Sequence, residues 1–273
     1  MTNNLLDGTC LDKEFCKSLN TGTVVVSCGS KGSGKSCFML AMLRACVDAN
    51  AFEEYVLFFP SLYVEQHDSY CWCLKQKQFT IYTAYHNMIL EKLYTQNKDR
   101  KKQKKTLVVI DDATTFAKEL KNPANENLIA LVSQARHLQV SLWILVHSLK
   151  SIISPCLREN TGWLLIYSVT NAKLLNDIHE EYLSVQCDYK TFAEWYRIMS
   201  KEKYSSFMLK TNPPVAIDIH SSEWKMIERF REMNFNDANL YKNHGKKLAS
   251  VACVDWPHAR TSVKEPRKTT NPL

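Results

Sequence analysis

Residues 29–36 have the composition and spacing needed to bind the phosphates of a nucleotide. They read Gly-Ser-Lys-Gly-Ser-Gly-Lys-Ser, and although this pattern occurs by chance in glycine-rich loops, the β-branched run before it and the helix-favouring segment after it favour phosphate binding. Glycines let several backbone N–H groups point at one anion, Lys35 would reach the β- and γ-phosphates, and Ser36 would offer its hydroxyl to Mg²⁺. The predicted nucleotide-binding residues are Gly29, Ser30, Lys31, Gly32, Ser33, Gly34, Lys35, Ser36 and Cys37.

Two adjacent carboxylates supply the second half of a nucleotide-hydrolysing site. Asp111 and Asp112 follow the apolar run 106–110, which has the length and composition of a buried central strand. Such a strand would hold both acids rigidly beside the phosphate loop, so that Asp111 binds Mg²⁺ and Asp112 polarises the attacking water. Alternatively, Asp112 could cap a following helix. The combination with the loop at 29–36 favours the catalytic interpretation, in which the two motifs are Walker A and Walker B.

Two further polar residues lie at the end of a predicted helix and at the end of the strand after it. The segment 126–137 has helical spacing and carries Arg136 near its end, and the strand 140–146 is closed by His147. An arginine at the end of a helix is more often a favourable partner of the helix dipole than a catalytic group. His147 stands where a polar residue that senses the γ-phosphate is expected, so both residues are candidates whose roles depend on the wider pattern.

The composition is that of a soluble globular protein with a surplus of basic residues. A length of 273 residues is enough for one substantial domain, with or without a smaller appendage. Hydrophobic residues make up 45% and charged residues 23%, as in globular proteins. The formal net charge of +7 suits contact with a polyanion, although ordinary surfaces also carry such a balance. No apolar run approaches the roughly 20 residues of a membrane span.

The ten cysteines are expected to be reduced thiols. Residues 1–20 contain several acids and lack the apolar core of a signal peptide, which argues against a secreted, disulfide-bonded protein. The cluster His67, Cys71 and Cys73 could form half a zinc site, but its spacing is poor and no second pair of ligands follows. We therefore expect no zinc there.

Short apolar strands alternate with helical stretches, which predicts a mainly parallel sheet with helices on both faces. We expect strands at 23–28, 55–59, 106–110, 140–146, 163–167, 204–210 and 215–219. We expect helices at 34–48, 82–94, 126–137, 171–182, 188–200 and 221–241, with a polar connection at 117–125. From residue 244 the chain is basic and contains proline, which predicts a loosely ordered tail.

Two segments have side chains that could contact nucleic acid. Residues 61–80 are irregular and rich in aromatic side chains, which can stack on bases but more often pack in a core. The run from Lys98 to Lys105 has six basic side chains in eight positions, typical either of a solvated loop or of a surface for a polyanion. Because this run precedes a parallel strand, we expect it at the end of the sheet opposite the nucleotide.

The ordered set of motifs resembles one family of P-loop proteins. Between about residues 22 and 183 the chain contains GSKGSGKS, LVVIDD, ARHLQVSLWILVHS, PCLRENTGWLLIY and NAKLLNDIHEEY in that order. This set is similar to that of the poxvirus-type genome-packaging ATPases of large eukaryotic DNA viruses, virophages and polinton-like elements, a branch of the FtsK/HerA superfamily. The Arg-His pair, followed by a serine and by a strand that ends in a polar residue, is the most specific part of the likeness.

The resemblance implies an α/β P-loop NTPase of the RecA-like, FtsK/HerA type that hydrolyses ATP with Mg²⁺ and moves double-stranded DNA into a preformed capsid. It implies that Arg136 is an arginine finger in the neighbouring subunit's site, which requires a homo-oligomeric ring, a pentamer or a hexamer. It also implies a capsid or portal vertex protein as partner, and a place in the host cytoplasm at the viral factory or capsid vertex. Two positions depart from the common pattern, because His147 stands where the family usually has Gln and Asp112 where many superfamily members have Glu.

We predict a strap at 1–20, an ATPase core at 21–185, a small C-terminal appendage at 186–247 and a basic tail at 248–273. DNA would be held nonspecifically by its phosphates, with Lys98 to Lys105 and Lys242 to Lys247 as candidate contacts. Two other functions stay open: another P-loop DNA enzyme, such as a helicase or a transposition-associated ATPase, and a nucleotide-gated assembly protein with negligible turnover. The complete set of motif residues, Lys35, Ser36, Asp111 and Asp112, argues against the second.

Overall fold

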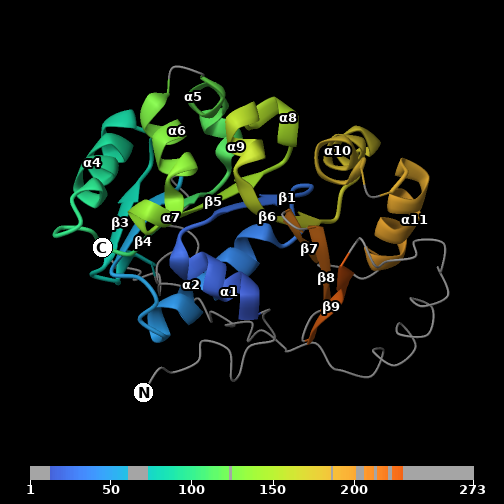
Figure 1. Cartoon of the computed structure of the whole chain (residues 1–273), viewed down its shortest axis with the longest axis horizontal. Coiled ribbons are helices and arrows are strands. Elements are labelled where there is room, and N and C mark those ends of the chain that lie inside the picture. Colours follow the sequence, from blue (N-terminus) through green and yellow to red (C-terminus); the bar gives the residue numbers. More distant parts are fainter. Residues whose placement is uncertain are drawn as a thin grey trace, which may run out of the picture.

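The computed structural model describes residues 13–60, 73–122, 125–185, 187–200, 206–211, 214–220 and 223–229. Its strands form one nine-stranded sheet in the order β3-β2-β4-β5-β1-β6-β7-β8-β9. The six strands from β3 to β6 in this order are parallel, and β7, β8 and β9 continue the sheet antiparallel (Figure 1). The bounds are β1 Val24–Cys28, β2 Glu54–Phe58, β3 Phe79–Tyr82, β4 Thr106–Ile110, β5 Val140–Val146, β6 Thr161–Tyr167, β7 Ser206–Thr211, β8 Pro214–His220 and β9 Glu223–Arg229.

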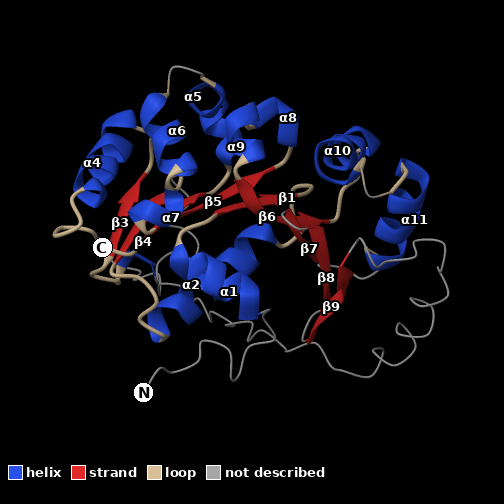
Figure 2. Cartoon of the chain, viewed as in Figure 1, coloured by secondary structure: helices blue, strands red, loops and turns tan. Residues whose placement is uncertain are grey.

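Helices cover both faces of the sheet (Figure 2). On one side lie α1 and α2, and on the other lie α4 to α9, as the two separate groups of buried side chains also indicate. The bounds are α1 Lys13–Thr21, α2 Lys35–Asp48, α4 Asn87–Lys98, α5 Ala117–Lys121, α6 Glu126–Ser133, α7 Ala135–Leu138, α8 Leu149–Ile152, α9 Pro155–Glu159, α10 Ala172–Ile178 and α11 Tyr189–Met199. A 3₁₀ turn, η2 Ala113–Phe116, precedes α5, and a π-helical segment, η3 His179–Leu183, follows α10.

The central strands are buried on both faces, which explains their near-continuous apolar sequence. Every residue of β1, β4 and β5 is buried. In β4, Val108 and Ile110 pack toward α4 and α6, whereas Leu107 and Val109 pack toward α2. A rigid, doubly covered sheet therefore carries the loops at the two ends of its strands.

Four expectations about secondary structure are wrong in the described residues. Helix α4 begins at Asn87 and not at residue 82, because Phe79–Tyr82 forms the edge strand β3 beside β2. The segment 117–125, expected as a polar connection, begins with α5. The helix expected at 126–137 is divided at Gln134 into α6 and α7. Residues 223–229, expected within a helix, form β9, in which Trp224 and Met226 alternate with charged residues as a strand requires.

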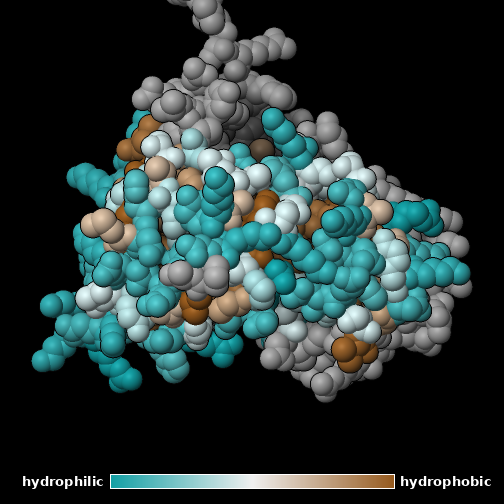
Figure 3. Space-filling model, turned by 90° about the horizontal axis from the view of Figure 1, so that it is seen from above, coloured by the Kyte–Doolittle hydropathy of each residue, from teal (hydrophilic) through white to brown (hydrophobic). Residues whose placement is uncertain are grey.

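Several sequence expectations concern residues outside the described ranges. These are the first part of the strap, most of the aromatic segment and of the His67–Cys73 cluster, the basic residues Lys242 to Lys247, and the tail. Across the ranges that are described, no helix is both long enough and apolar enough to cross a bilayer. The face on the side of α5, α6 and α8 is mainly hydrophilic, with scattered apolar residues (Figure 3).

Candidate active site

The predicted phosphate loop connects the end of β1 to the start of α2. Gly32 and Gly34 have left-handed backbone conformations, with φ of 73° and 97°, which glycine adopts without strain. At Gly29 the constraint is space, because an added Cβ would lie 2.7 Å from the Cβ of Tyr167. The strand, the loop and the helix thus follow one another as the sequence predicts. Of the other loop residues, Ser33 is buried, whereas Lys31 and Cys37 are exposed.

The ammonium group of Lys35 lies inside this loop. Its Nζ donates hydrogen bonds of 2.8 Å to the carbonyl oxygens of Gly29 and Ser30, and it lies 3.5 Å from the Oγ of Ser33. The residue is only 7% exposed. Burial lowers the pKa of Lys35, and the opposing electrostatic effect of the nearby carboxylates of Asp111 and Asp112 is smaller. The loop therefore holds a partly desolvated ammonium group where it could interact with the phosphates of a bound nucleotide.

The phosphate loop and the paired carboxylates meet at Ser36. The Ser36 hydroxyl donates a hydrogen bond of 3.1 Å to Oδ1 of Asp111, and the same oxygen accepts one of 2.9 Å from the backbone N–H of Asp112. The backbone N–H of Asp111 donates to the carbonyl of Phe58 on β2 at 3.0 Å. A hydroxyl and a carboxylate oxygen side by side are ligands that Mg²⁺ accepts, so Ser36 and Asp111 fit a magnesium ion.

Asp112 and His147 lie at the same edge of the sheet. The Asp112 side chain is about half exposed, at 52%, and its backbone is left-handed with φ of 45°. His147, directly after β5, places Nδ1 3.0 Å from the carbonyl of Gly29 and 3.3 Å from Nζ of Lys35. Its Nε2 lies 3.8 Å from Oδ1 of Asp112. The imidazole therefore stands between the lysine of the loop and the second carboxylate.

The loop after β6 is a part of the site that sequence reasoning missed. The backbone N–H of Ser30 donates to the carbonyl of Ser168 at 2.8 Å, and that of Thr170 donates to the Ser30 hydroxyl at 3.1 Å. The two hydroxyls of Ser30 and Thr170 are 3.0 Å apart. Position gives the signal that could have found this loop, because it follows a parallel strand that neighbours β1.

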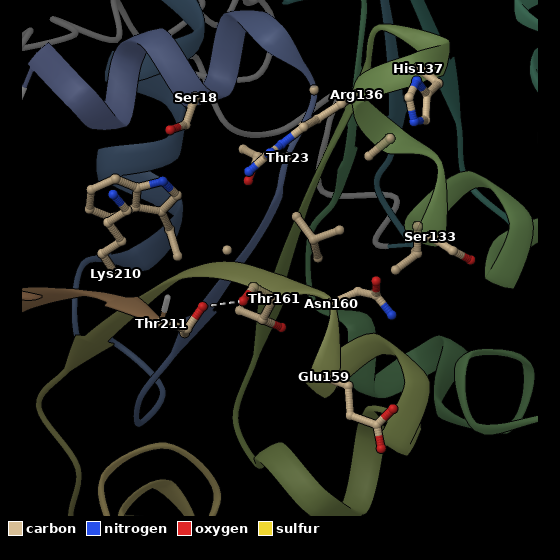
Figure 4. Close-up of a pocket in the computed structure, with 16 residues that line it drawn as sticks. Ser18, Thr23, Ser133, Arg136, His137, Glu159, Asn160, Thr161, Lys210 and Thr211 are labelled. Atoms are coloured by element: carbon tan, nitrogen blue, oxygen red, sulfur yellow. Dashed lines mark hydrogen bonds between the residues drawn. The ribbon is translucent and has the colours of Figure 1, made fainter. Parts of the chain in front are cut away.

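Arg136 lies at the opposite edge of the sheet from Lys35. It is exposed on α7, which precedes β5, whereas the phosphate loop follows β1, and these two strands run parallel. A cleft of about 380 Å³ opens here between α1, α7 and the starts of the strands, and Arg136 extends from α7 toward the part that Thr23 lines (Figure 4). The structure thus brings Lys35, Ser36, Asp111, Asp112 and His147 together and leaves Arg136 apart from them.

The basic run from Lys98 to Lys105 also lies where its position in the sequence predicts. It connects α4 to the start of β4, so it shares the Arg136 edge of the sheet, and its lysines are exposed. The side chain of Gln103 in this run donates a hydrogen bond of 2.6 Å to the carbonyl of His137 on α7. The run is therefore in contact with the helix that carries Arg136.

The phosphate loop, the paired carboxylates and the mainly parallel sheet flanked by helices have the arrangement of a P-loop NTPase. The chain belongs to the poxvirus A32 protein family, whose sequence model matches residues 15–209. The family and the fold class predicted from the sequence are thus confirmed. No curated protein sequence matches the chain at a significant level.

Solved structures of ATP-binding proteins share this fold at low sequence identity. B204, the DNA-packaging ATPase from Sulfolobus Turreted Icosahedral Virus, is 16% identical with a TM-score of 0.55, and the match covers 77% of this chain and 98% of B204. B204 from Sulfolobus turreted icosahedral virus 2 in complex with ATP-γS gives a TM-score of 0.50 at 16% identity, with the same coverage. The pCW3 conjugation coupling protein TcpA with ATPγS gives 0.54 at 15%, over 84% of this chain and 66% of TcpA.

Proposed function

We propose that this protein is an ATPase that packages a viral genome by translocating double-stranded DNA into a preformed capsid. The observation that carries the proposal is the 3.1 Å hydrogen bond between Ser36 and Asp111, which joins the two halves of a hydrolytic site. Membership of the poxvirus A32 protein family and the fold shared with a DNA-packaging ATPase support the biological role.

We call the side of the sheet where the parallel strands end its carboxyl edge, and the side where they begin its amino edge. Each side chain at the carboxyl edge has a defined task in this proposal. Lys35 neutralises charge on the β- and γ-phosphates, and the backbone N–H groups of residues 29–34 bind the same phosphates. Asp112 accepts a proton from, and orients, the water that attacks the γ-phosphate in line. Ser36 and Asp111 would hold Mg²⁺, which would supply positive charge to the phosphate oxygens. His147, placed between Lys35 and Asp112, responds to the presence of the γ-phosphate.

Arg136 completes the site of a neighbouring protomer in a closed homo-oligomeric ring of five or six subunits. Its exposure and its location at the far edge of the sheet support a role outside its own protomer. A guanidinium supplied in trans stabilises the charge that develops on the transferred phosphoryl group. In this arrangement hydrolysis depends on assembly, and DNA in the ring is contacted mainly at its phosphates, with a capsid or portal vertex protein as the docking partner.

A different DNA enzyme with the same fold is the second candidate function. The shared fold with TcpA, a conjugation coupling protein, makes it a specific alternative. A packaging motor should move along intact duplex, whereas a helicase should separate the strands of a forked substrate. Strand displacement from a forked duplex, measured beside translocation on a blunt duplex, therefore distinguishes a helicase from the proposed motor.

Steady-state ATP hydrolysis across a range of protein concentrations, with and without linear double-stranded DNA, tests the proposal. We expect turnover per protomer to rise with concentration and with DNA. We also expect Arg136→Ala and Asp112→Asn to be inactive separately and partly active when mixed, because each supplies what the other lacks. The proposed motor, in which each active site includes an arginine from a neighbouring protomer, would be overturned by either of two results. One is no activity under any condition, and the other is activity that is independent of concentration and unchanged by Arg136→Ala.

A further inference from the structure

The helix that carries Arg136 is too short to be stable by itself. Helix α7 has four residues, and the last carbonyl groups of any helix lack partners within it. Side chains from the end of α4 and from the loop after it supply those partners. Gln103 donates to the carbonyl of His137 at 2.6 Å, and Asn97 donates to that of Leu138 at 3.0 Å. Two side chains from outside α7 thus bond the carbonyl groups at its end.

The opposite side of α7 is in direct contact with the turn between α1 and β1. A Cβ added at Gly22 would lie 2.3 Å from the carbonyl oxygen of Ala135 and 2.9 Å from Cα of Arg136. Gly22 also has φ of 91°, so this turn is adapted to a close approach of backbone to backbone. Helix α7 is thus held between Gly22 and the segment 97–105.

Asn97 and Gln103 also organise the loop itself, residues 99–105. Asn97 is 1% exposed and bonds both the carbonyl and the N–H of Lys104, at 2.9 and 3.3 Å. Gln103 donates a second bond, of 3.2 Å, to the carbonyl of Asn97. The same two side chains therefore belong both to the loop structure and to the contact with α7.

The outer surface of this loop is strongly basic. Arg100 and the loop lysines are exposed, whereas Gln103 between them is half-buried against α7. The acid in the loop, Asp99, lies 3.6 Å from Lys102 and accepts a bond of 3.0 Å from the N–H of Lys101. A folded loop that presents several cations outward suits the closely spaced phosphates of duplex DNA.

We propose that the α4–β4 loop positions Arg136 in response to DNA: phosphates bound by its lysines shift the loop, and Asn97 and Gln103 carry that shift to α7. The inference rests on the proposed function, since it takes Arg136 as the group that acts on a neighbour. Gln103 and Asn97 are positioning residues and do not touch nucleotide. In this arrangement, DNA on one protomer raises hydrolysis in the site that receives its arginine.

Gln103→Glu tests the coupling, because it replaces the donating amide by a carboxylate that repels the two carbonyl groups. Lys102→Gln is the matched control: it lowers the net charge of the loop by one unit, as Gln103→Glu does, but at the adjacent position, whose side chain contacts Asp99 and not α7. We expect both variants to bind linear duplex DNA somewhat more weakly. At saturating DNA, Lys102→Gln should reach the wild-type stimulated turnover, whereas Gln103→Glu should fall at least about fivefold below it. The stimulated turnover of Gln103→Ala should also be lower than that of the wild type.

A complementation assay separates positioning from a general structural defect. Mixed with Asp112→Asn, which keeps its arginine, Gln103→Glu should regain stimulated turnover, as Arg136→Ala does. Wild-type stimulation in Gln103→Glu at saturating DNA, or a loss that Asp112→Asn does not rescue, overturns the coupling while the proposed function stands. If DNA does not stimulate turnover of the wild-type protein, or if Arg136→Ala does not change turnover, the proposed function and the coupling are both overturned.

Discussion

The two edges of the sheet hold their functional side chains in different ways. At the carboxyl edge, Lys35 is 7% exposed and its ammonium donates two bonds of 2.8 Å within one loop. At the amino edge, Arg136 is exposed on a helix of four residues that depends on neighbouring segments for its position. The first edge is organised within one protomer, whereas the second leaves its arginine exposed, where we propose that it acts on a neighbouring protomer. Variants at the two edges should therefore fail in different ways.

The largest effect is expected from Lys35→Ala at the carboxyl edge. Loss of the ammonium removes a buried positive charge from the place where phosphate charge develops, so hydrolysis should fall by about a thousandfold or more. Steady-state phosphate release measures this, with the exposed Lys121→Ala on α5 as a control for removal of a lysine charge. In mixtures with Arg136→Ala, the Lys35→Ala protein should act only as the arginine donor. Appreciable hydrolysis by Lys35→Ala alone would mean that the carboxyl edge is not the catalytic site.

A smaller loss is expected from Asp112→Asn, which keeps the shape of the side chain and removes its basicity. Because the amide cannot accept the proton of the attacking water, turnover should fall by about a hundredfold to a few hundredfold. Nucleotide binding should be retained, since the phosphate loop and the Ser36–Asp111 bond are untouched. Equilibrium binding of a fluorescent ATP analogue beside single-turnover hydrolysis separates the two quantities. A loss of binding as large as the loss of turnover would contradict the role of Asp112 as base.

At the amino edge, Gly22→Ala should disturb folding more than chemistry. The added Cβ would overlap Ala135 and Arg136 at a left-handed φ, and we expect a loss of about 2–4 kcal/mol in the free energy of unfolding. Gly32→Ala is the matched control: its φ is also left-handed, at 73°, but a Cβ there would meet nothing within 4 Å, so about 1–2 kcal/mol should be lost. Urea denaturation followed by circular dichroism measures both. Equal losses would show that contact with α7 adds nothing to the cost.

The carboxyl edge was more predictable from the sequence than the amino edge. Its residues lie in contiguous motifs whose strand and helix context is local, so Lys35, Ser36, Asp111, Asp112 and His147 could be placed together before the fold was known. The contact between Gln103 and His137 joins segments that are 34 residues apart, and no local pattern encodes it. Strands β3 and β9 were missed for the same reason, since each is defined by pairing with a neighbour.

The division into strap, core, appendage and tail stays a prediction. One structural fact bears on the predicted appendage at 186–247: its strand β7 pairs with β6 and thereby extends the sheet of the predicted core. The site-residue roles likewise stay proposals that the variants above test. What the fold adds is the separation of Arg136 from the site around Lys35, which the order of these residues in the sequence does not show.

The smallest effect concerns the thiols around the phosphate loop, and it tests how accessible the carboxyl edge is. Burial raises the pKa of Cys28 to about 12, so at about pH 8 this thiol is neutral and shielded, whereas Cys37 is exposed at the start of α2. We expect a maleimide to label Cys37 and to leave Cys28 unlabelled, as measured by peptide mass spectrometry. MgATP at ten times its Kd should slow the labelling of Cys37 about tenfold, and Cys37→Ser should remove that signal. Equal labelling of both thiols would show that the carboxyl edge opens in solution, which would weaken its contrast with the exposed amino edge.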